Sequence, residues 1–166
     1  MYDTISALFY AVNCGVKNVF VMKILVLNGP NLNMLGIRER AIYGAGTYAD
    51  LMDFIKTKAD ALGIDVEIKQ SNHEGVLVDW VQEARGVYDA IVINAAAYTH
   101  TSLAILDALK AVSLPVAEVH LSEPKAREEF RHFSYVSLVA EKVFSGEGFK
   151  SYEKAIEYFA LASRLS

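Results

Sequence analysis

The sequence predicts an α/β protein built on a doubly wound, five-stranded parallel sheet in the strand order 2-1-3-4-5. Three observations lead to this prediction. Five strand-like segments alternate with helical segments, the run Ala90–Ile93 has the unbroken hydrophobicity of a strand buried on both faces, and 166 residues suit one such domain. Because crossovers between parallel strands are right-handed, helices are expected on both faces of the sheet.

The first half of the domain supplies two strands and one helix. Lys23–Leu27 is an apolar first strand. Thr47–Leu62 has the apolar spacing of an amphipathic helix, begins with a capping box made by Thr47 and Asp50, and ends at a glycine. Asp65–Lys69 alternates polar and apolar residues, which is typical of a half-exposed edge strand.

The second half continues the alternation. Pro124 favours the start of a short helix, because the first helical position needs no N–H. The expected elements are a helix over Gly75–Arg85, the strand Ala90–Ile93, a helix over Ser102–Val112, the strand Pro115–Val119, a short helix over Pro124–Arg131, the strand Glu141–Phe144 and a closing helix over Tyr152–Leu165.

Composition argues against several classes of protein. The net charge is −4 and the basic residues form no stripe, which argues against a nucleic-acid surface. The single Cys14 excludes an intrachain disulfide and a multi-thiolate metal site, and it fits a reducing compartment. We therefore expect a cytoplasmic protein.

Residues 1–21 are expected to be an N-terminal extension, and residues 22–166 a single catalytic domain. The first residues carry no positive charge, and polar residues interrupt the apolar patches that follow, so neither a secretory signal nor a membrane span is expected. Two explanations stay open: an upstream in-frame extension that is not normally translated, or an arm that packs on a neighbour.

A long loop follows the first strand. From Gly29 to Gly46 it spans 18 residues without helical or strand periodicity, whereas such connections usually take about 2–6 residues. It is too apolar for a solvated tail. These properties indicate a working lid, and the loop also carries Arg38 and Tyr43.

Polar residues follow three of the expected strands, where ligands bind in doubly wound sheets. They are Asn28, Asn31, Arg38 and Tyr43 after the first strand, Asn94, Thr99, His100 and Thr101 after the third, and His120 and Ser122 after the fourth. The sequence shows no phosphate-binding glycine motif at the first turn and no carboxylate cluster with metal-ligand spacing. Tyr, Arg, His and Asn are the equipment of general acid–base chemistry.

Tyr43 is a candidate base. A free phenol has a pKa near 10, and a permanently charged guanidinium such as that of Arg38 would favour the phenolate. Lowering the pKa by about two units requires roughly 2.7 kcal/mol, which a dehydrated Arg–phenolate contact can supply. The alternative is that Tyr43 only anchors the loop through its ring.

His120 is the candidate acid. Glu118 lies two residues earlier, so the two side chains share one side of a strand, and a carboxylate there raises the imidazole pKa and fixes its tautomer. Alternatively, His120 is simply hydrogen-bonded at a strand end. His100 and Asn94 are candidates for holding hydroxyl groups; Arg131 is a candidate donor or else a solvated residue.

Seven segments together resemble the type II 3-dehydroquinate dehydratases, from about Met22 to the closing helix. They are Leu27–Gly36, Arg38–Glu39, Tyr43–Gly44, Gln70–Gly75, Asn94–Ser102, Glu118–Ser122 and Ala126–His132. The resemblance implies a flavodoxin-like fold and anti elimination of water from 3-dehydroquinate through an enolate, giving 3-dehydroshikimate. It implies no cofactor, no metal and no Schiff-base lysine, and a homo-oligomer, a dodecamer built from trimers.

The resemblance also implies a role for each site residue. Tyr43 would take the C2 proton, Arg38 would lower its pKa, and Asn31 would help hold a water that stabilises the enolate. His120 would protonate the departing C1 hydroxyl, with Glu118 orienting it. The substrate would be bound by the amides of Leu121 and Ser122 at its carboxylate, by Asn94, His100 and Arg131 at its hydroxyls, and by Asp107 of an adjacent subunit.

The chain departs from the family pattern at four positions. They are Arg40 in place of Pro, Glu123 in place of Asn, Phe133 in place of His and Ser151 in place of Gly. Glu123 is expected to be a poorer N-cap and to place a negative charge beside the carboxylate-binding amides. Two alternatives stay open: a flavodoxin-like binding module without turnover, such as a receiver or a flavin carrier, or a family member that has lost activity.

Overall fold

The computed structural model describes residues 21–37 and 46–163. Their core is a five-stranded, all-parallel sheet in the order β2-β1-β3-β4-β5, which confirms the predicted fold and strand order. The strands are β1 (Lys23–Asn28), β2 (Asp65–Gln70), β3 (Ala90–Asn94), β4 (Val116–Val119) and β5 (Lys142–Phe144). The expectations for residues 1–20, including Cys14, and for residues 38–45, including Arg38, Arg40 and Tyr43, lie outside the described residues.

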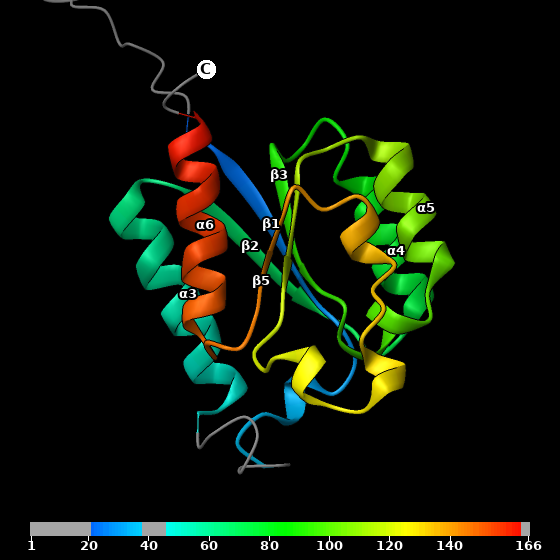
Figure 1. Cartoon of the computed structure of the whole chain (residues 1–166). Helices are drawn as coiled ribbons and strands as arrows, with labels where there is room; N and C mark the ends of the chain where they lie inside the picture. Colours follow the sequence, from blue (N-terminus) through cyan, green and yellow to red (C-terminus); the bar gives the residue numbers. More distant parts are fainter. Residues whose placement is uncertain (1–20, 38–45, 164–166) are drawn as a thin grey trace, which may run out of the picture.

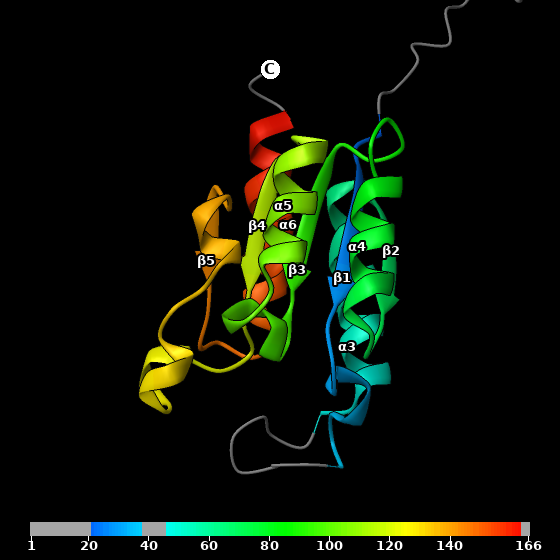
Figure 2. The same cartoon turned by 90° about the vertical axis from the view of Figure 1, so that its right-hand side faces the viewer.

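Two helices cover each face of the sheet (Figures 1 and 2). The helices α3 (Tyr48–Leu62) and α6 (Lys150–Ser163) lie on one face, and α4 (Glu74–Glu83) and α5 (Leu103–Val112) lie on the other. Each pair packs on its own cluster of buried residues, because alternate side chains of β1 and β3 point to opposite faces. None of these described helices combines the length and the hydropathy that crossing a bilayer requires.

Local sequence signals place the helix ends. The Thr47 hydroxyl accepts from the Asp50 amide, and the Asp50 carboxylate accepts from the Thr47 amide, so the predicted capping box is confirmed. Gly63 ends α3 in the left-handed conformation (φ 69°). Ser102 caps α5 by accepting from the Ile105 amide at 2.9 Å.

The expected short helix over 124–131 is wrong. The segment forms two separate 3₁₀ turns, η3 (Pro124–Ala126) and η4 (Glu129–Arg131), because Arg127 between them is extended (ψ −162°). Two further 3₁₀ segments were not expected, η2 (Ala96–His100) and η5 (Val136–Leu138). The Glu123 side chain accepts from the Lys125 amide, which favours a short turn at that point over the start of one continuous helix.

The loop after β1 is ordered at its start. A 3₁₀ turn, η1 (Leu32–Met34), stands where no regular structure was expected, and Leu32 and Leu35 are buried in the core on the α3 side. Asn31 takes up the left-handed conformation (φ 66°), and its backbone N–H donates to Asn72 Oδ1 at 2.9 Å. This part of the loop is therefore packed rather than solvated, as its apolar composition predicts.

Candidate active site

Two asparagines end the adjacent central strands. Asn28 and Asn94 are paired in the β1–β3 register, and both are buried. The Tyr152 hydroxyl of α6 lies between them, donating to Asn28 Oδ1 at 2.6 Å and accepting from Asn94 Nδ2 at 2.9 Å. Burial raises the pKa of the Tyr152 hydroxyl far above its ordinary value, so it remains neutral. This network fixes the floor of the site at the point where the strand order reverses.

Replacing Tyr152 by phenylalanine should destabilise the fold by about 1–3 kcal/mol, because the buried atoms Asn28 Oδ1 and Asn94 Nδ2 each lose their hydrogen bond to its hydroxyl. Urea unfolding followed by circular dichroism measures this loss. The matched control is Tyr158→Phe, whose hydroxyl donates to Glu141 at the surface and whose removal should cost no more than about 0.5 kcal/mol. Equal losses in the two variants would contradict the interpretation.

A cavity of about 400 Å³ opens above these asparagines, at the carboxyl ends of β1, β3 and β4. The structure brings seven of the predicted site residues together at its wall: Asn31, Asn94, His100, His120, Leu121, Ser122 and Arg131. Its remaining wall is formed by Pro30, Leu32, Ala96, Ala97, Pro124 and Arg127. The cavity therefore lies at the edge of the sheet where the sequence placed a ligand.

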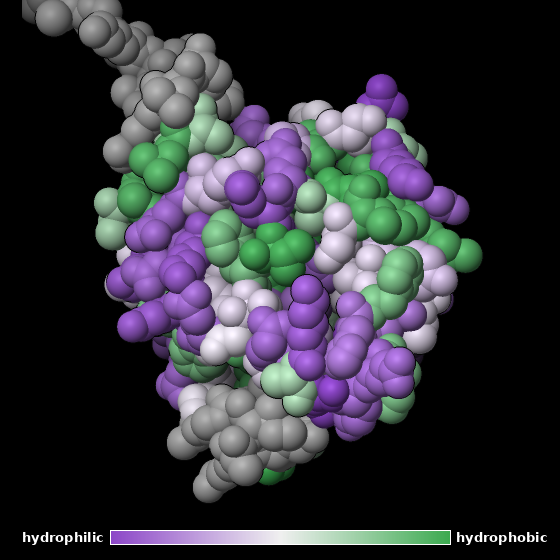
Figure 3. All heavy atoms as spheres, in the orientation of Figure 1, coloured by the Kyte–Doolittle hydropathy of each residue, from purple (hydrophilic) through white to green (hydrophobic). Residues whose placement is uncertain are grey.

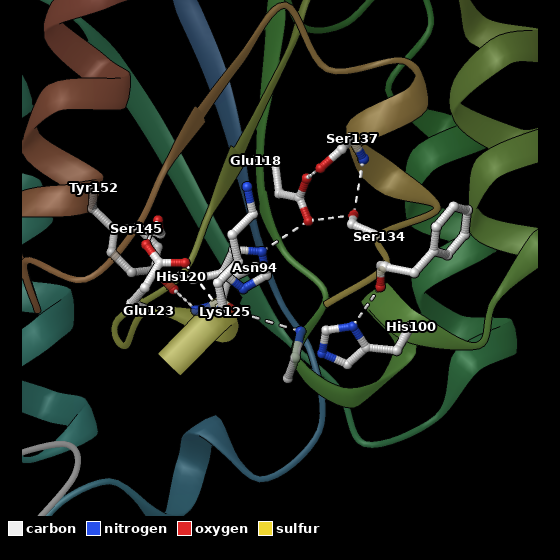
Figure 4. Close-up of polar contacts among 12 residues, drawn as sticks. Asn94, His100, Glu118, His120, Glu123, Lys125, Ser134, Ser137, Ser145 and Tyr152 are labelled. Carbon is white, nitrogen blue, oxygen red and sulfur yellow. Dashed lines mark hydrogen bonds and ion pairs between the residues drawn. The ribbon is translucent and has the colours of Figure 1, made fainter. Parts of the chain in front are cut away.

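Glu118 and His120 form the polar centre of the site (Figure 4). His120 Nε2 lies 2.8 Å from Glu118 Oε1; the histidine is 8% exposed and the carboxylate is fully buried. Burial alone would raise the pKa of the Glu118 carboxyl, but the bonds from His120 and two serine hydroxyls together outweigh it, so this pKa lies below its ordinary value. The charged Glu118 thus accepts the hydrogen bond from His120 Nε2, which leaves Nδ1 of the same ring for a bound molecule.

The other polar side chains of the wall are held by local contacts. His100 Nδ1 donates to the Phe133 carbonyl at 2.7 Å, which leaves Nε2 for a ligand (Figure 4). Arg131 Nε binds Glu128 at 2.9 Å. Asn94 faces the cavity although Tyr152 and the Ala96 amide already bind its side chain.

The backbone after β4 offers donors. Within the described ranges, the amides of Leu121 and Ser122 donate to no other group, whereas the His120 amide is bonded to the Phe144 carbonyl. Two neighbouring free amides beside Arg127 and Arg131 suit an anionic group such as a carboxylate. The sequence analysis gave Arg127 no role in the site. The only feature of the sequence that could have indicated a role for Arg127 in the site is its position four residues before Arg131.

Asp107 is the one predicted residue of the described ranges that stands apart. It lies on the exposed side of α5 and does not line the cavity of its own chain. A role in substrate binding therefore requires a neighbouring subunit, as the resemblance implies. Within residues 21–37 and 46–163, no cluster of three or more His, Cys, Asp or Glu side chains has the geometry to hold a metal ion.

Three of the departures from the family pattern are visible. Glu123 does act as an N-cap, because its carboxylate accepts from the Lys125 amide at 3.1 Å, and it also accepts from the Ser145 hydroxyl at 2.6 Å. Phe133 binds His100 through its backbone carbonyl. Having Phe in place of His at this position therefore leaves that hydrogen bond intact. Ser151 adds a hydroxyl that accepts from the Glu147 amide at 3.3 Å, before the first turn of α6.

A doubly wound sheet with a buried histidine–carboxylate pair at the wall of a cavity is typical of an α/β enzyme. The family model for class II dehydroquinases matches residues 22–160. The chain belongs to this family.

Similar proteins agree with that assignment. The 3-dehydroquinate dehydratase of Caulobacter vibrioides is 57% identical over 137 residues, which cover 82% of this chain and 94% of that protein. The enzyme of the same name from Phenylobacterium zucineum is 57% identical over 141 residues, covering 85% and 97% of the two chains. The crystal structure of type II dehydroquinase from Butyrivibrio crossotus superposes with a TM-score of 0.82 at 50% identity, covering 83% and 97%.

Proposed function

We propose that this protein is a 3-dehydroquinate dehydratase that converts 3-dehydroquinate to 3-dehydroshikimate, a step of the shikimate pathway, with residues 22–166 as its catalytic domain. The observation that carries the proposal is the buried Glu118–His120 pair at the wall of a 400 Å³ cavity, in a chain 57% identical to proteins of that name. Loss of water beside a ketone needs a base for the proton and an acid for the departing hydroxyl.

In the proposed mechanism, His120 is the acid. Its imidazolium, stabilised by Glu118, protonates the C1 hydroxyl, which leaves as water. Tyr43 takes the C2 proton, with Arg38 stabilising its phenolate, and the resulting enolate is stabilised by a water that Asn31 helps to hold. The roles of Tyr43 and Arg38 are taken from the resemblance of their sequence segment, because both lie outside the described residues.

Substrate binding uses the rest of the wall. The amides of Leu121 and Ser122 hold the substrate carboxylate; Asn94, His100 and Arg131 hold its hydroxyls. Asp107 completes the site of an adjacent subunit in a dodecamer of trimers. Exposed apolar side chains such as Leu138 and Val143, near the β5 edge, support association between copies, and Figure 3 shows apolar residues over β5 on this face.

One assay tests the function. The conjugated enone of the product absorbs in the ultraviolet, so 3-dehydroquinate should give a rising absorbance with the wild-type protein and almost none with Tyr43→Phe. No rise with the wild type would favour a family member without activity or a binding module. A yellow colour of the purified protein would favour a flavin carrier.

The departures at positions 40 and 123 predict weaker substrate binding rather than weaker chemistry. Glu123 stays ionised, because bonds from Ser145 and the Lys125 amide hold its pKa below the ordinary value. Removing this charge by Glu123→Asn should lower KM for the anionic substrate about 2- to 5-fold, equivalent to about 0.5–1 kcal/mol. Arg40→Pro should also lower KM by stiffening the loop.

Steady-state kinetics checks both variants. Ser145→Ala is the matched control for Glu123→Asn, because it removes a hydrogen bond of Glu123 but keeps the charge, so its KM should stay near the wild-type value. An unchanged KM in both Glu123→Asn and Arg40→Pro would count against this explanation.

A further inference from the structure

Three groups contact the buried carboxylate of Glu118, and two of them come from a different part of the chain (Figure 4). His120 Nε2 and the Ser134 hydroxyl both bind Oε1, at 2.8 and 2.7 Å. The Ser137 hydroxyl donates to the other oxygen, Oε2. Each oxygen of the carboxylate is therefore held by a serine, and the carboxylate cannot rotate without losing a hydrogen bond.

The two serines are themselves fixed by the start of η5. The Ser134 hydroxyl oxygen accepts from the Ser137 amide at 2.9 Å, so its single hydrogen is directed to Glu118. The Tyr135 amide anchors the same segment by donating to the Thr99 carbonyl at 2.9 Å. The donors thus have a defined direction before any substrate binds, which is a requirement for a preorganised site.

A second cavity, of about 320 Å³, lies behind this arrangement. His120, Ser134 and Ser137 line it. Thr99 also lines it, and its Oγ1 is the one buried side-chain nitrogen or oxygen of the described ranges without a hydrogen-bond partner. The two serine partners of Glu118 therefore border open space, whereas Glu118 itself is fully buried and does not line this cavity. The charged or titratable groups around this cavity are His100, His120, Glu123, Lys125, Arg131 and His132.

We propose that Ser134 and Ser137 are positioning residues that hold the Glu118 carboxylate in the orientation that aligns His120 as the acid. The proposal rests on the proposed dehydration for its kinetic consequence. Without the serine hydroxyls, the carboxylate would lose two of its three hydrogen bonds, and the His120 ring would lose its fixed orientation. Neither serine lines the 400 Å³ cavity, so substrate binding should not depend on them.

Ser137 gives the cleaner test, because Ser134 also accepts from a backbone amide of η5. Ser137→Ala should lower kcat about tenfold, the factor that matches the loss of one hydrogen bond to a charged group, and leave KM unchanged. Removing a donor to the charged form should also raise the Glu118 pKa. Ser137→Thr keeps the hydroxyl and should restore both values.

A measurement without substrate separates this proposal from the proposed function. The pH titration of the Glu118 side-chain ¹³C resonance should move upward in Ser137→Ala and return in Ser137→Thr. An inactive wild-type protein with this titration shift would overturn the function but support the positioning. An active wild type with unchanged kcat and titration in Ser137→Ala, or a failure of Ser137→Thr to rescue both, would overturn the positioning proposal.

A double-mutant cycle that combines Ser137→Ala with Glu118→Gln gives a further test. If Ser137→Ala has no further effect on kcat once Glu118 is replaced, the proposal is supported; additive effects of the two substitutions would overturn it.

Discussion

Replacing His120 by glutamine should lower kcat by about 10²- to 10⁴-fold, the range that general acid catalysis contributes. His120 is the described side chain that combines a place in the cavity wall with a bond to a buried carboxylate. Glutamine cannot carry a transferable proton at neutral pH, yet its amide can still donate to Glu118. The substitution therefore removes the acid without leaving the carboxylate unpaired, which would itself cost stability.

The enone assay measures the loss, and thermal unfolding shows whether the variant is folded. His73→Gln is the matched control: His73 precedes α4, its side chain does not cap that helix, and it does not line the cavity, so its kcat should stay close to the wild-type value. Comparable kcat values for His120→Gln and the wild type would exclude His120 as the acid. A lower kcat together with a much lower unfolding temperature would instead indicate a structural role.

Gly29→Ala should destabilise the protein by about 3 kcal/mol and lower its unfolding temperature by about 6–12 °C. A Cβ at this position would lie 2.4 Å from the carbonyl oxygen of Ala95, and the atom it meets is backbone, which cannot rotate away. The Gly29 amide also donates to the Asn94 carbonyl at 2.8 Å. The chain segments after β1 and β3 are thus in direct backbone contact beside the cavity.

Calorimetry of Gly29→Ala measures this loss of stability. Gly75→Ala is the control, because the surroundings of Gly75 are open. Gly75 lies in the first turn of α4 with no atom within 4 Å of an added Cβ, so alanine there should stabilise the protein by about 0.5–1 kcal/mol. Opposite signs for the two variants are expected. A Gly29→Ala variant as stable as the wild type would show that the two loops can separate without cost.

The sheet and its four covering helices could be predicted because their signals are local. The continuous apolar run of β3, the alternation along β2 and the Thr47–Asp50 capping box each depend on residues close in sequence. The prediction failed over residues 124–131, where helical spacing and a well-placed Pro124 indicated one helix. There the Glu123 carboxylate binds the Lys125 amide and the backbone at Arg127 is extended. The spacing of residues in the sequence does not reveal this competition between a side chain and the helical backbone.

The site was predicted in part, for the same physical reason. His120 and Glu118 are two residues apart on one strand, so their contact follows from strand geometry. The bond between Tyr152 and Asn28 joins residues 124 positions apart, and Ser137 meets Glu118 across 19 positions. Such contacts depend on the packed fold, and no spacing rule in the sequence indicates them. Arg127 was missed because an arginine among glutamates has the pattern of a solvated surface.

The bridge made by Tyr152 has a consequence for how the protein is made. The residue that joins the ends of the two central strands belongs to α6, the last helix of the described chain. During synthesis, the sheet and every residue of the cavity wall emerge from the ribosome before this helix does. A nascent chain that ends before position 150 therefore carries all of its wall residues but lacks the hydroxyl that joins their floor. Catalytic competence should arise late and abruptly, when the final helix docks.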